Sequence, residues 1–297
     1  MYRIMRALHG SITALVTPFK GEAVDDKTFQ RLVNRQIDAG AHGLVPVGTT
    51  GESATLSHAE HRRVVELAIE AAAGRVPVIA GAGSNSTAEA IELAKFAERA
   101  GADAILAVTG YYNKPSQAGL VAHFTALHDA TGLPIVIYNV PGRTVANLSV
   151  ETIATLSKLP RIIGVKDATG DLARVALQRL ASGKDFIQIS GEDMTAVGFN
   201  AMGGRGCISV TANVAPELCS KMQKASLDGD YASALALQDA LAPLHEILFK
   251  DTSPGPVKFA MSLMGLCAGE LRLPLVPPPE PVKKRVREVL EVLGLIG

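Results

Sequence analysis

Lys166 is the residue of this chain with the clearest potential for covalent chemistry, because it directly follows a short apolar segment. Residues 162–165 have the pattern of a strand, and Lys166 closes it. Alternation along a strand predicts that Lys166 shares a face with Gly164 and Ile162, with Ile163 on the opposite face. Desolvation penalises an ammonium group. Such a lysine therefore either extends its charge back to solvent or acts as the amine that forms an imine with a carbonyl compound.

Imine chemistry also needs groups that deliver a proton to the departing hydroxyl, and hydroxyl side chains follow several other apolar segments. Tyr138 ends one such segment, and Thr50 and Tyr112 each follow another. Neighbouring parallel strands lie about 4.8 Å apart, so Tyr138 and Lys166 would enter one pocket if both point inward. A structural explanation also exists for each residue: a strand-end tyrosine can be an amphipathic core residue, and Thr49 with Thr50 can brace a tight loop.

Arg143 is the expected partner for a substrate carboxylate, because a guanidinium can bind a carboxylate with two parallel hydrogen bonds. The loop at residues 191–193 is acidic, which disfavours the phosphate site that many barrels carry there. The alternative for Arg143 is a surface arginine without a ligand. No metal site is expected, because His58 and His61 share a helical face but have no evident third ligand.

Short apolar segments alternate with longer amphipathic segments along the first part of the chain, which predicts strands followed by helices. The predicted strands are 11–17, 43–47, 77–80, 104–108, 134–138, 162–166, 186–190 and 206–209. The predicted helices are 26–39, 57–73, 86–100, 117–131, 149–156, 171–181, 193–202 and 215–227. Eight such units with nearly continuous apolar strands predict an α/β fold, a closed (β/α)8 TIM barrel whose active site lies at the carboxyl ends of the strands.

An open, doubly wound sheet is the alternative fold. The run from Gly81 to Ser86 follows a strand and precedes a helix, as a dinucleotide-binding fingerprint does, but its third glycine is missing. Asp103 also lies before the next strand rather than at its carboxyl end. We expect the barrel to cover residues 1–228, and residues 229–297 to form a C-terminal helical region packed on it, with helices at 231–249, 254–266 and 281–293.

Composition narrows the class of protein further. The 297 residues are 47% hydrophobic and carry 29 basic and 29 acidic side chains without a basic cluster, which argues against nucleic-acid and membrane-surface partners. No apolar run reaches the roughly 20 residues of a membrane span. The three cysteines are far apart and favour neither a disulfide framework nor a zinc site. We therefore expect a cytoplasmic protein.

Five motifs, each at the end of a predicted strand, make the chain similar over its length to the dihydrodipicolinate synthase family of pyruvate-dependent class I aldolases, which includes N-acetylneuraminate lyase. They are Leu15-Val16-Thr17-Pro18-Phe19, Gly48-Thr49-Thr50-Gly51-Glu52-Ser53, Tyr111-Tyr112-Asn113-Lys114-Pro115, Tyr138-Asn139-Val140-Pro141-Gly142-Arg143-Thr144 and Gly164-Val165-Lys166-Asp167-Ala168-Thr169-Gly170. The resemblance implies a lyase that condenses pyruvate with aspartate semialdehyde to 4-hydroxy-tetrahydrodipicolinate, in lysine and diaminopimelate biosynthesis. It implies no cofactor beyond the covalent pyruvate imine.

The resemblance also implies roles for individual residues. Lys166 would form the Schiff base, with Tyr138, Thr50 and Tyr112 as the proton relay, and Tyr112 would reach into the site of a neighbouring subunit. Thr49 and Thr50 would hold the pyruvate carboxylate, Arg143 would bind that of aspartate semialdehyde, and Ile208 would line the pocket with its carbonyl facing the lysine. The cross-subunit role implies a homo-oligomer, expected as a tetramer built from two dimers.

Some family members are inhibited by lysine at the dimer interface, which implies L-lysine as an effector here. The matching positions are Ser53, Ala54, His58, His61, Asn85, Glu89 and Tyr111. Packing of the dimer is the alternative role for these residues. One departure from the family pattern is Gly110, where proline is expected before the two tyrosines.

Two other functions remain open from the sequence. The first is another pyruvate-dependent aldolase acting on 2-keto-3-deoxy sugar acids, although the Gly142-Arg143-Thr144 run is absent from sugar-acid lyases of the family. The second is a catalytically silent barrel that serves as a binding or assembly protein. Reaction of pyruvate at Lys166 separates the enzymes from the silent barrel, and assays with the two kinds of aldehyde separate the enzymes from each other.

Overall fold

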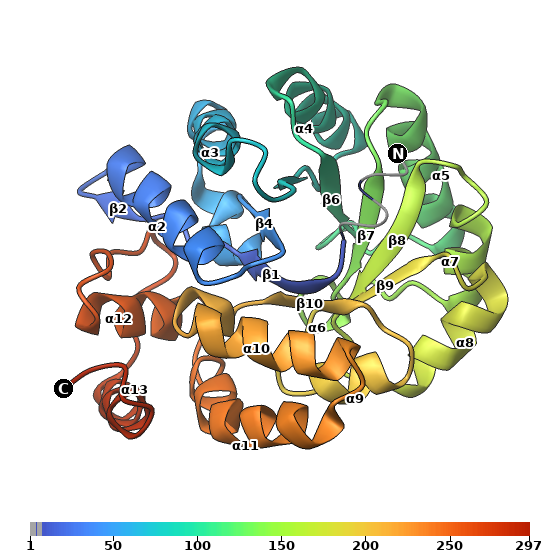
Figure 1. Cartoon of the computed structure of the whole chain (residues 1–297). Coiled ribbons are helices and arrows are strands. Elements are labelled where there is room, and N and C mark those ends of the chain that lie inside the picture. Colours follow the sequence, from blue (N-terminus) through green and yellow to red (C-terminus); the bar gives the residue numbers. More distant parts are fainter. Residues whose placement is uncertain (1–3, 5–7) are drawn as a thin grey trace.

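Eight parallel strands form the centre of the molecule in the computed structural model, which describes Ile4 and residues 8–297 (Figure 1). Their order around the sheet is β4-β1-β10-β9-β8-β7-β6-β5. The strands are β1 (Gly10–Ala14), β4 (Gly43–Val45), β5 (Ile79–Gly81), β6 (Ala104–Val108), β7 (Ile135–Asn139), β8 (Ile162–Asp167), β9 (Ile187–Ser190) and β10 (Gly206–Ser209). A parallel bridge between Leu44 of β4 and Val78, the residue before β5, joins the two ends of the sheet and closes the barrel, which confirms the predicted fold.

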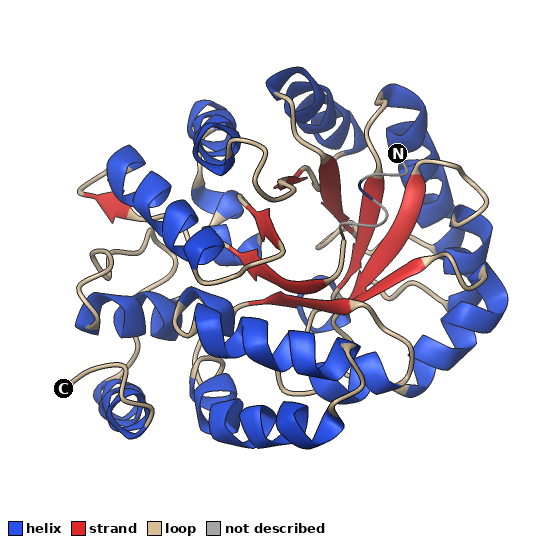
Figure 2. Ribbon diagram, in the orientation of Figure 1, coloured by secondary structure: helices blue, strands red, loops and turns tan. Residues whose placement is uncertain are grey.

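Helices surround the strands on the outside (Figure 2). They are α2 (Asp26–Asp38), α3 (His58–Ala72), α4 (Thr87–Ala100), α5 (Gln117–Ala130), α6 (Pro141–Thr144), α7 (Val150–Leu156), α8 (Ala173–Ser182), α9 (Ala196–Ala201), α10 (Pro216–Leu227), α11 (Tyr231–Ile247), α12 (Gly255–Leu263) and α13 (Glu280–Val292). Several begin at a side-chain cap, as at Ser57, whose hydroxyl accepts from the Glu60 amide while the Glu60 carboxylate accepts from the Ser57 amide.

Several short elements were not predicted, and several predicted elements are shorter than expected. The hairpin of β2 (Phe19–Lys20) with β3 (Ala23–Val24) and the single turn of α6 are too short to produce a periodic pattern. Strand β1 ends at Ala14 rather than at residue 17. Helix α9 begins at Ala196 rather than at residue 193, because the Asp193 carboxylate is used to accept backbone hydrogen bonds from the segment after β10.

Apolar side chains divide between the inside of the barrel and the layer between strands and helices. On β6, Leu106 belongs to the inner cluster and Ile105 to the outer cluster. The same alternation holds on β7, where Tyr138 is inner and Ile137 outer. Because both faces of each strand are buried, most strand residues are apolar, as the sequence indicated.

Strict alternation fails on β8, and the predicted faces of its first residues were wrong. Ile162 packs in the outer cluster and Ile163 in the inner cluster, the reverse of the expectation. The cause is a bulge: Ile162 is opposite Ile135 but Gly164 is opposite the next residue, Val136, so Ile163 is an extra residue. A Cβ atom on Gly164 would lie 2.4 Å from the Ile187 carbonyl oxygen, so the close approach of β9 requires glycine there.

Helices α10 to α13 gather on one side of the barrel (Figure 1) and share an apolar core with it. Val16 and Leu32 from the barrel pack in the same cluster as Leu241 and Val286 of the C-terminal region. Among the described residues, no helix is both long and apolar enough to cross a membrane.

Arg272 links the C-terminal segment to the start of α3. Its guanidinium donates to both carboxylate oxygens of Glu60, at 2.8 and 2.5 Å, and also to the Thr55 carbonyl at 3.1 Å. These hydrogen bonds, together with those from Ser57, lower the pKa of Glu60 to about 2 from an ordinary 4.5. Glu60 therefore stabilises the fold above pH 4.5, and this contribution is lost as the pH falls toward 2.

A Glu60→Gln variant tests this link. At pH 7 the variant should have a lower Tm than the wild-type protein. The difference in Tm should shrink as the pH is lowered below 4.5, because the Glu60 carboxylate of the wild type is then protonated in the unfolded state but still ionised in the folded state. Thermal unfolding followed by circular dichroism between pH 7 and 3 measures this difference. Glu92→Gln is the control, since the Glu92 carboxylate has no hydrogen-bond or ion-pair partner among the described residues. A difference in Tm that is independent of pH would contradict the role of Glu60.

Candidate active site

Lys166 and Tyr138 lie opposite each other on the adjacent strands β8 and β7, and both side chains are directed into the barrel. The Lys166 amine lies 4.1 Å from the centre of the Tyr138 ring. Lys166 is only 5% exposed and Tyr138 only 7%. Among the described residues, no acidic group forms an ion pair with Lys166. The structure thus brings together the buried amine and the phenol that the sequence predicted for imine chemistry.

A cavity at the carboxyl ends of the strands contains these two side chains. Five of the residues that the sequence singled out line it together: Thr49, Thr50, Tyr138, Arg143 and Lys166. Two of them lie on the strands β7 and β8, and the other three lie on the segments that follow β4 and β7. Their assembly depends on barrel closure, because parallel strands place all their carboxyl ends on one rim.

Thr49 and Thr50 begin the 3₁₀ turn η1 (Thr49–Gly51), which follows β4. The Thr17 hydroxyl donates to the Gly51 carbonyl at 2.7 Å and fixes the end of this turn. No hydrogen bond joins the Thr50 hydroxyl to the Tyr138 hydroxyl in the part of the chain that the structure describes. The two residues line one cavity, so a bound substrate or water would be needed to complete a relay between their hydroxyls.

Arg143 lies on the single-turn helix α6, which begins with Pro141 immediately after β7. Its side chain lines both the Lys166 cavity and a second, neighbouring cavity. Within residues 8–297, the guanidinium has no hydrogen-bond or ion-pair partner. A cation exposed at the mouth of a small cavity is suited to bind an anionic substrate group.

Two predicted site residues lie outside the Lys166 cavity. Tyr112 is 91% exposed, has a φ of 69°, and does not line the cavity of its own chain. Ile208 lies on β10, packs in the inner cluster opposite Ile12 and is buried beneath the cavity rather than in its wall. The role of each therefore remains a prediction.

Most of the residues predicted for the lysine site surround the second cavity. Those in its wall are Ser53, Ala54, His58, His61, Glu89 and Tyr111. Asn85 is absent from the wall, and its carbonyl accepts from the Asn113 amide at 3.0 Å. Burial lowers the pKa of His61 to about 4, so this imidazole is neutral near pH 7. Thr49 and Arg143 belong to the walls of both cavities, which makes the two cavities direct neighbours.

Sequence reasoning missed several residues of the site. Phe249 and Ser253, from the C-terminal region, line the Lys166 cavity, but nothing in their local pattern relates them to a strand end. Gly191 also lines it, and a Cβ atom there would lie 3.0 Å from Lys166 Cε and 2.7 Å from Ala168 Cβ. Glycine at this position leaves room for the lysine. Among the described residues, no group of three or more His, Cys, Asp and Glu side chains is placed to hold a metal.

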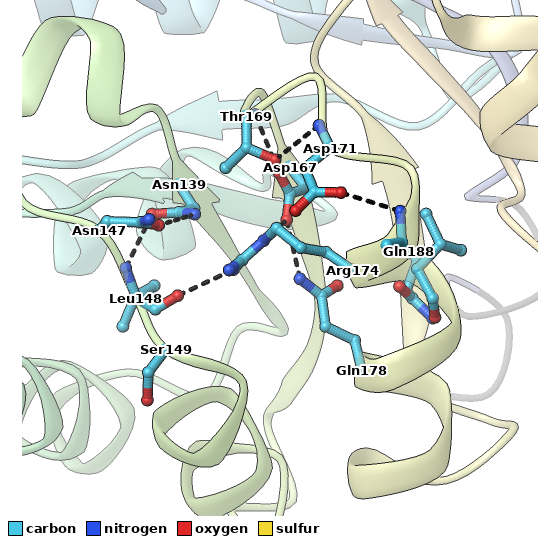
Figure 3. Close-up of polar contacts among 12 residues, drawn as sticks. Asn139, Asn147, Leu148, Ser149, Asp167, Thr169, Asp171, Arg174, Gln178 and Gln188 are labelled. Carbon is cyan, nitrogen blue, oxygen red and sulfur yellow. Dashed lines mark hydrogen bonds and ion pairs between the residues drawn. The ribbon is translucent and has the colours of Figure 1, made fainter.

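A polar network on the outer side of the barrel holds the residues that follow Lys166 and Tyr138 (Figure 3). Asp167, buried next to Lys166, accepts from Arg174 Nε at 3.0 Å and from Gln178 Nε2 at 2.7 Å, both on α8. Arg174 also donates to the Leu148 carbonyl at 2.8 Å. The Leu148 amide in turn donates to Asn139, the residue after Tyr138, at 3.0 Å. The network thus ties together the carboxyl ends of β7 and β8.

Replacement of Arg174 by alanine should destabilise the protein by about 3 kcal/mol, because it leaves the buried Asp167 carboxylate without its cationic partner. Urea denaturation followed by circular dichroism measures the loss. The matched control is Arg179→Ala on the same helix, where an exposed guanidinium donates only to the Met202 carbonyl. We expect that change to be within about 1 kcal/mol of wild type. Equal losses in the two variants would show that the network adds nothing beyond a surface contact.

Comparison with known proteins places this site in a family. The model of the dihydrodipicolinate synthetase family matches residues 7–293. The chain is 61% identical over 288 residues to the 4-hydroxy-tetrahydrodipicolinate synthase of Parvibaculum lavamentivorans, covering 97% of this chain and 99% of the relative. It is 61% identical over 289 residues to that of Methylobacterium radiotolerans, covering 97% of each chain.

Solved structures give the same result. The pyruvate complex of the chloride-inhibited dihydrodipicolinate synthase from Acinetobacter baumannii has a TM-score of 0.95 at 45% identity, covering 97% of this chain and 100% of that one. The lysine-bound enzyme from Cyanidioschyzon merolae has a TM-score of 0.95 at 38% identity, covering 98% of this chain and 99% of that one. With the closed barrel and the Lys166 cavity, these similarities show that the chain belongs to the dihydrodipicolinate synthetase family.

Proposed function

We propose that this protein is a 4-hydroxy-tetrahydrodipicolinate synthase, a carbon–oxygen lyase that condenses pyruvate with L-aspartate 4-semialdehyde in lysine and diaminopimelate biosynthesis. The observation that carries the proposal is the common cavity of Lys166, Tyr138, Thr49, Thr50 and Arg143, in a chain 61% identical to enzymes of that name.

The chemistry begins with attack of the neutral Lys166 amine on the ketone carbon of pyruvate. The carbinolamine loses its hydroxyl as water when the Tyr138 phenol supplies a proton, and an imine remains. Loss of a proton from the pyruvate methyl group gives the enamine, whose carbon attacks the aldehyde of the second substrate. The amine of that substrate then displaces Lys166 by transimination, which closes the ring and frees the enzyme.

The remaining site residues bind and orient the substrates. Thr49 and Thr50 hold the pyruvate carboxylate, and Thr50 passes protons between Tyr138 and bulk solvent together with Tyr112. Ile208 contributes its backbone carbonyl near the lysine. The exposure of Tyr112 in the isolated chain fits a role in the cavity of a neighbouring subunit. The active form is accordingly a homo-oligomer, a tetramer of two dimers.

Arg143 favours one class of aldehyde substrate over the other. Its guanidinium binds the carboxylate of aspartate semialdehyde at the mouth of the cavity. The alternative function is an aldolase of 2-keto-3-deoxy sugar acids. Arg143 argues against it, because that function does not explain a cation at this position. No cofactor takes part in the reaction. The compartment is the cytoplasm, in keeping with three unpaired cysteines.

Reduction with borohydride in the presence of pyruvate tests the proposed chemistry. The imine should be trapped as a stable adduct, seen by mass spectrometry on the peptide that contains Lys166. Lys166→Arg should give no adduct, because an arginine does not form this imine. Wild-type protein without an adduct would exclude the aldolase chemistry. Assays of the two aldehyde classes complete the test: turnover with aspartate semialdehyde supports the synthase, and turnover with sugar acids alone supports the alternative.

Feedback inhibition by L-lysine belongs to the same proposal. The second cavity offers Glu89 as a carboxylate for an ammonium group, and the His58 imidazole lies 3.5 Å from it. Tyr111 lines this cavity and precedes the proton-relay residue Tyr112. Lysine bound there would thus reach the relay through adjacent backbone, coupling effector to turnover.

Glu89→Gln separates effector binding from catalysis. In the wild type, saturating lysine should reduce turnover. In the variant the concentration for half-inhibition should rise about 10-fold, since one charged hydrogen bond is weakened, while turnover without lysine stays near wild type. Steady-state rates over a lysine titration measure both. Full activity of the wild type at saturating lysine would end the feedback hypothesis and leave the cavity residues as dimer packing.

A further inference from the structure

The turn that carries Thr49 and Thr50 is held between two strained residues. Val47, just before it, has a φ of 49°, and Glu52, just after it, has a φ of 55°. Left-handed backbone is unfavourable for residues other than glycine, above all for a β-branched valine. Such a conformation persists only where surrounding contacts enforce it. Enforcing contacts must therefore act on this turn.

Glu52 supplies such a contact through a fully buried ion pair. One carboxylate oxygen lies 2.5 Å from the Lys258 amine, and the other accepts from the Arg272 backbone amide at 3.1 Å. Both side chains of the pair are 0% exposed. Lys258 lies on α12, distant in the chain, and also donates to the Glu270 carbonyl at 2.8 Å. The C-terminal region thereby fixes the residue at the end of the catalytic turn.

Phe19 supports the pair from the side. The Lys258 amine lies 4.0 Å and the Arg272 guanidinium 4.4 Å from the centre of its ring. Burial lowers the pKa of Lys258, and the adjacent Glu52 carboxylate opposes that effect. Every charge of the cluster has an opposite charge or a dipole beside it. The cluster therefore has one fixed geometry, unlike an ion pair exposed to solvent.

Stability alone is a poor explanation for this arrangement. Desolvation of two ions commonly offsets their attraction, and apolar residues of similar volume often stabilise a core equally well. A buried pair does give a fixed distance and direction. At Glu52 that direction sets the backbone of the turn, because the Glu52 amide donates to the Thr49 carbonyl at 3.1 Å and the Gly51 amide to Gly48 at 3.0 Å.

We propose that Glu52 and Lys258 are positioning residues for the reaction, which hold Thr49 and Thr50 at the pyruvate side of the Lys166 cavity. The inference rests on the proposed function for its kinetic consequences. It assigns a task to the C-terminal region: the region supplies the buried cation that fixes a catalytic loop of the barrel. Arg143 lies on a different loop and is outside this effect.

Glu52→Gln tests the proposal with a nearly isosteric change. We expect kcat/KM for pyruvate to fall about 10²-fold, since displacement by about 1 Å at a reacting site has effects of that size. The KM for the aldehyde substrate should stay near wild type, because Arg143 is unmoved. A merely structural role would lower the active fraction and leave both KM values unchanged. Glu98→Gln is the matched control: its carboxylate also accepts from a loop, at Thr131 and Gly132, but at the opposite end of the barrel.

The double variant Glu52→Gln/Lys258→Met separates positioning from stability. Removal of both charges should return Tm toward wild type, whereas kcat/KM for pyruvate should stay low. A double variant with wild-type Tm and wild-type kinetics would overturn the proposal. If the Glu52 variants do not fold, Phe19→Leu provides a second test. We expect a smaller fall in kcat/KM for pyruvate in this variant, and an unchanged kcat/KM would overturn the proposal.

Hydrogen exchange of the backbone amides at 48–55 gives a result that does not depend on activity. Exchange there should be faster in Glu52→Gln than in the wild type or in Glu98→Gln, and unchanged exchange would overturn the proposal. The exchange measurement also distinguishes failure of the proposed function from failure of the positioning proposal. Absence of a pyruvate adduct in the wild type would defeat the proposed function, while faster exchange in the variant would still show that the pair fixes the turn.

Discussion

The parallel pairing of β7 with β8, in which Lys166 lies opposite Tyr138, is the constraint on which the rest of the site depends. A β-bulge at Ile163 sets this register, since without the extra residue each position beyond it would face the other side of the barrel. The bulge therefore turns the lysine inward. Its position beside β9 is possible because Gly164 has no side chain to meet the Ile187 carbonyl.

Polar contacts behind the Lys166 cavity fix the segments whose side chains line it. Outside the barrel, Asp167 and Arg174 join the strand that carries the lysine to the loop beyond Asn139 (Figure 3). At the other side of the cavity, Glu52 and Lys258 do the same for the threonine turn. Both arrangements bury charge, which is unfavourable unless every group is paired. A fully paired network of this kind gives the segments around the cavity a fixed geometry.

The two adjacent cavities share part of one wall. Thr49 and Arg143 line both, so a ligand in either cavity lies next to residues that serve the other. The loop after β4 and the turn after β7 form the boundary between the two cavities directly. The two cavities are thus built on the same few loops, with the barrel strands beneath them.

The sequence by itself determined the barrel, its strand and helix positions to within a few residues, and the set of residues at the carboxyl ends of the strands. These follow from local signals: apolar periodicity, helix caps and the chemistry of short motifs. Only the tertiary structure decided which faces the first residues of β8 present, that Phe249 and Ser253 complete the cavity, and that Lys258 is the partner of Glu52. Glu52 and Lys258 are separated by more than two hundred residues, and an isolated lysine in an amphipathic helix has the same local pattern whether it meets water or a buried carboxylate. The partner of a buried charge is fixed by packing, which no local pattern contains.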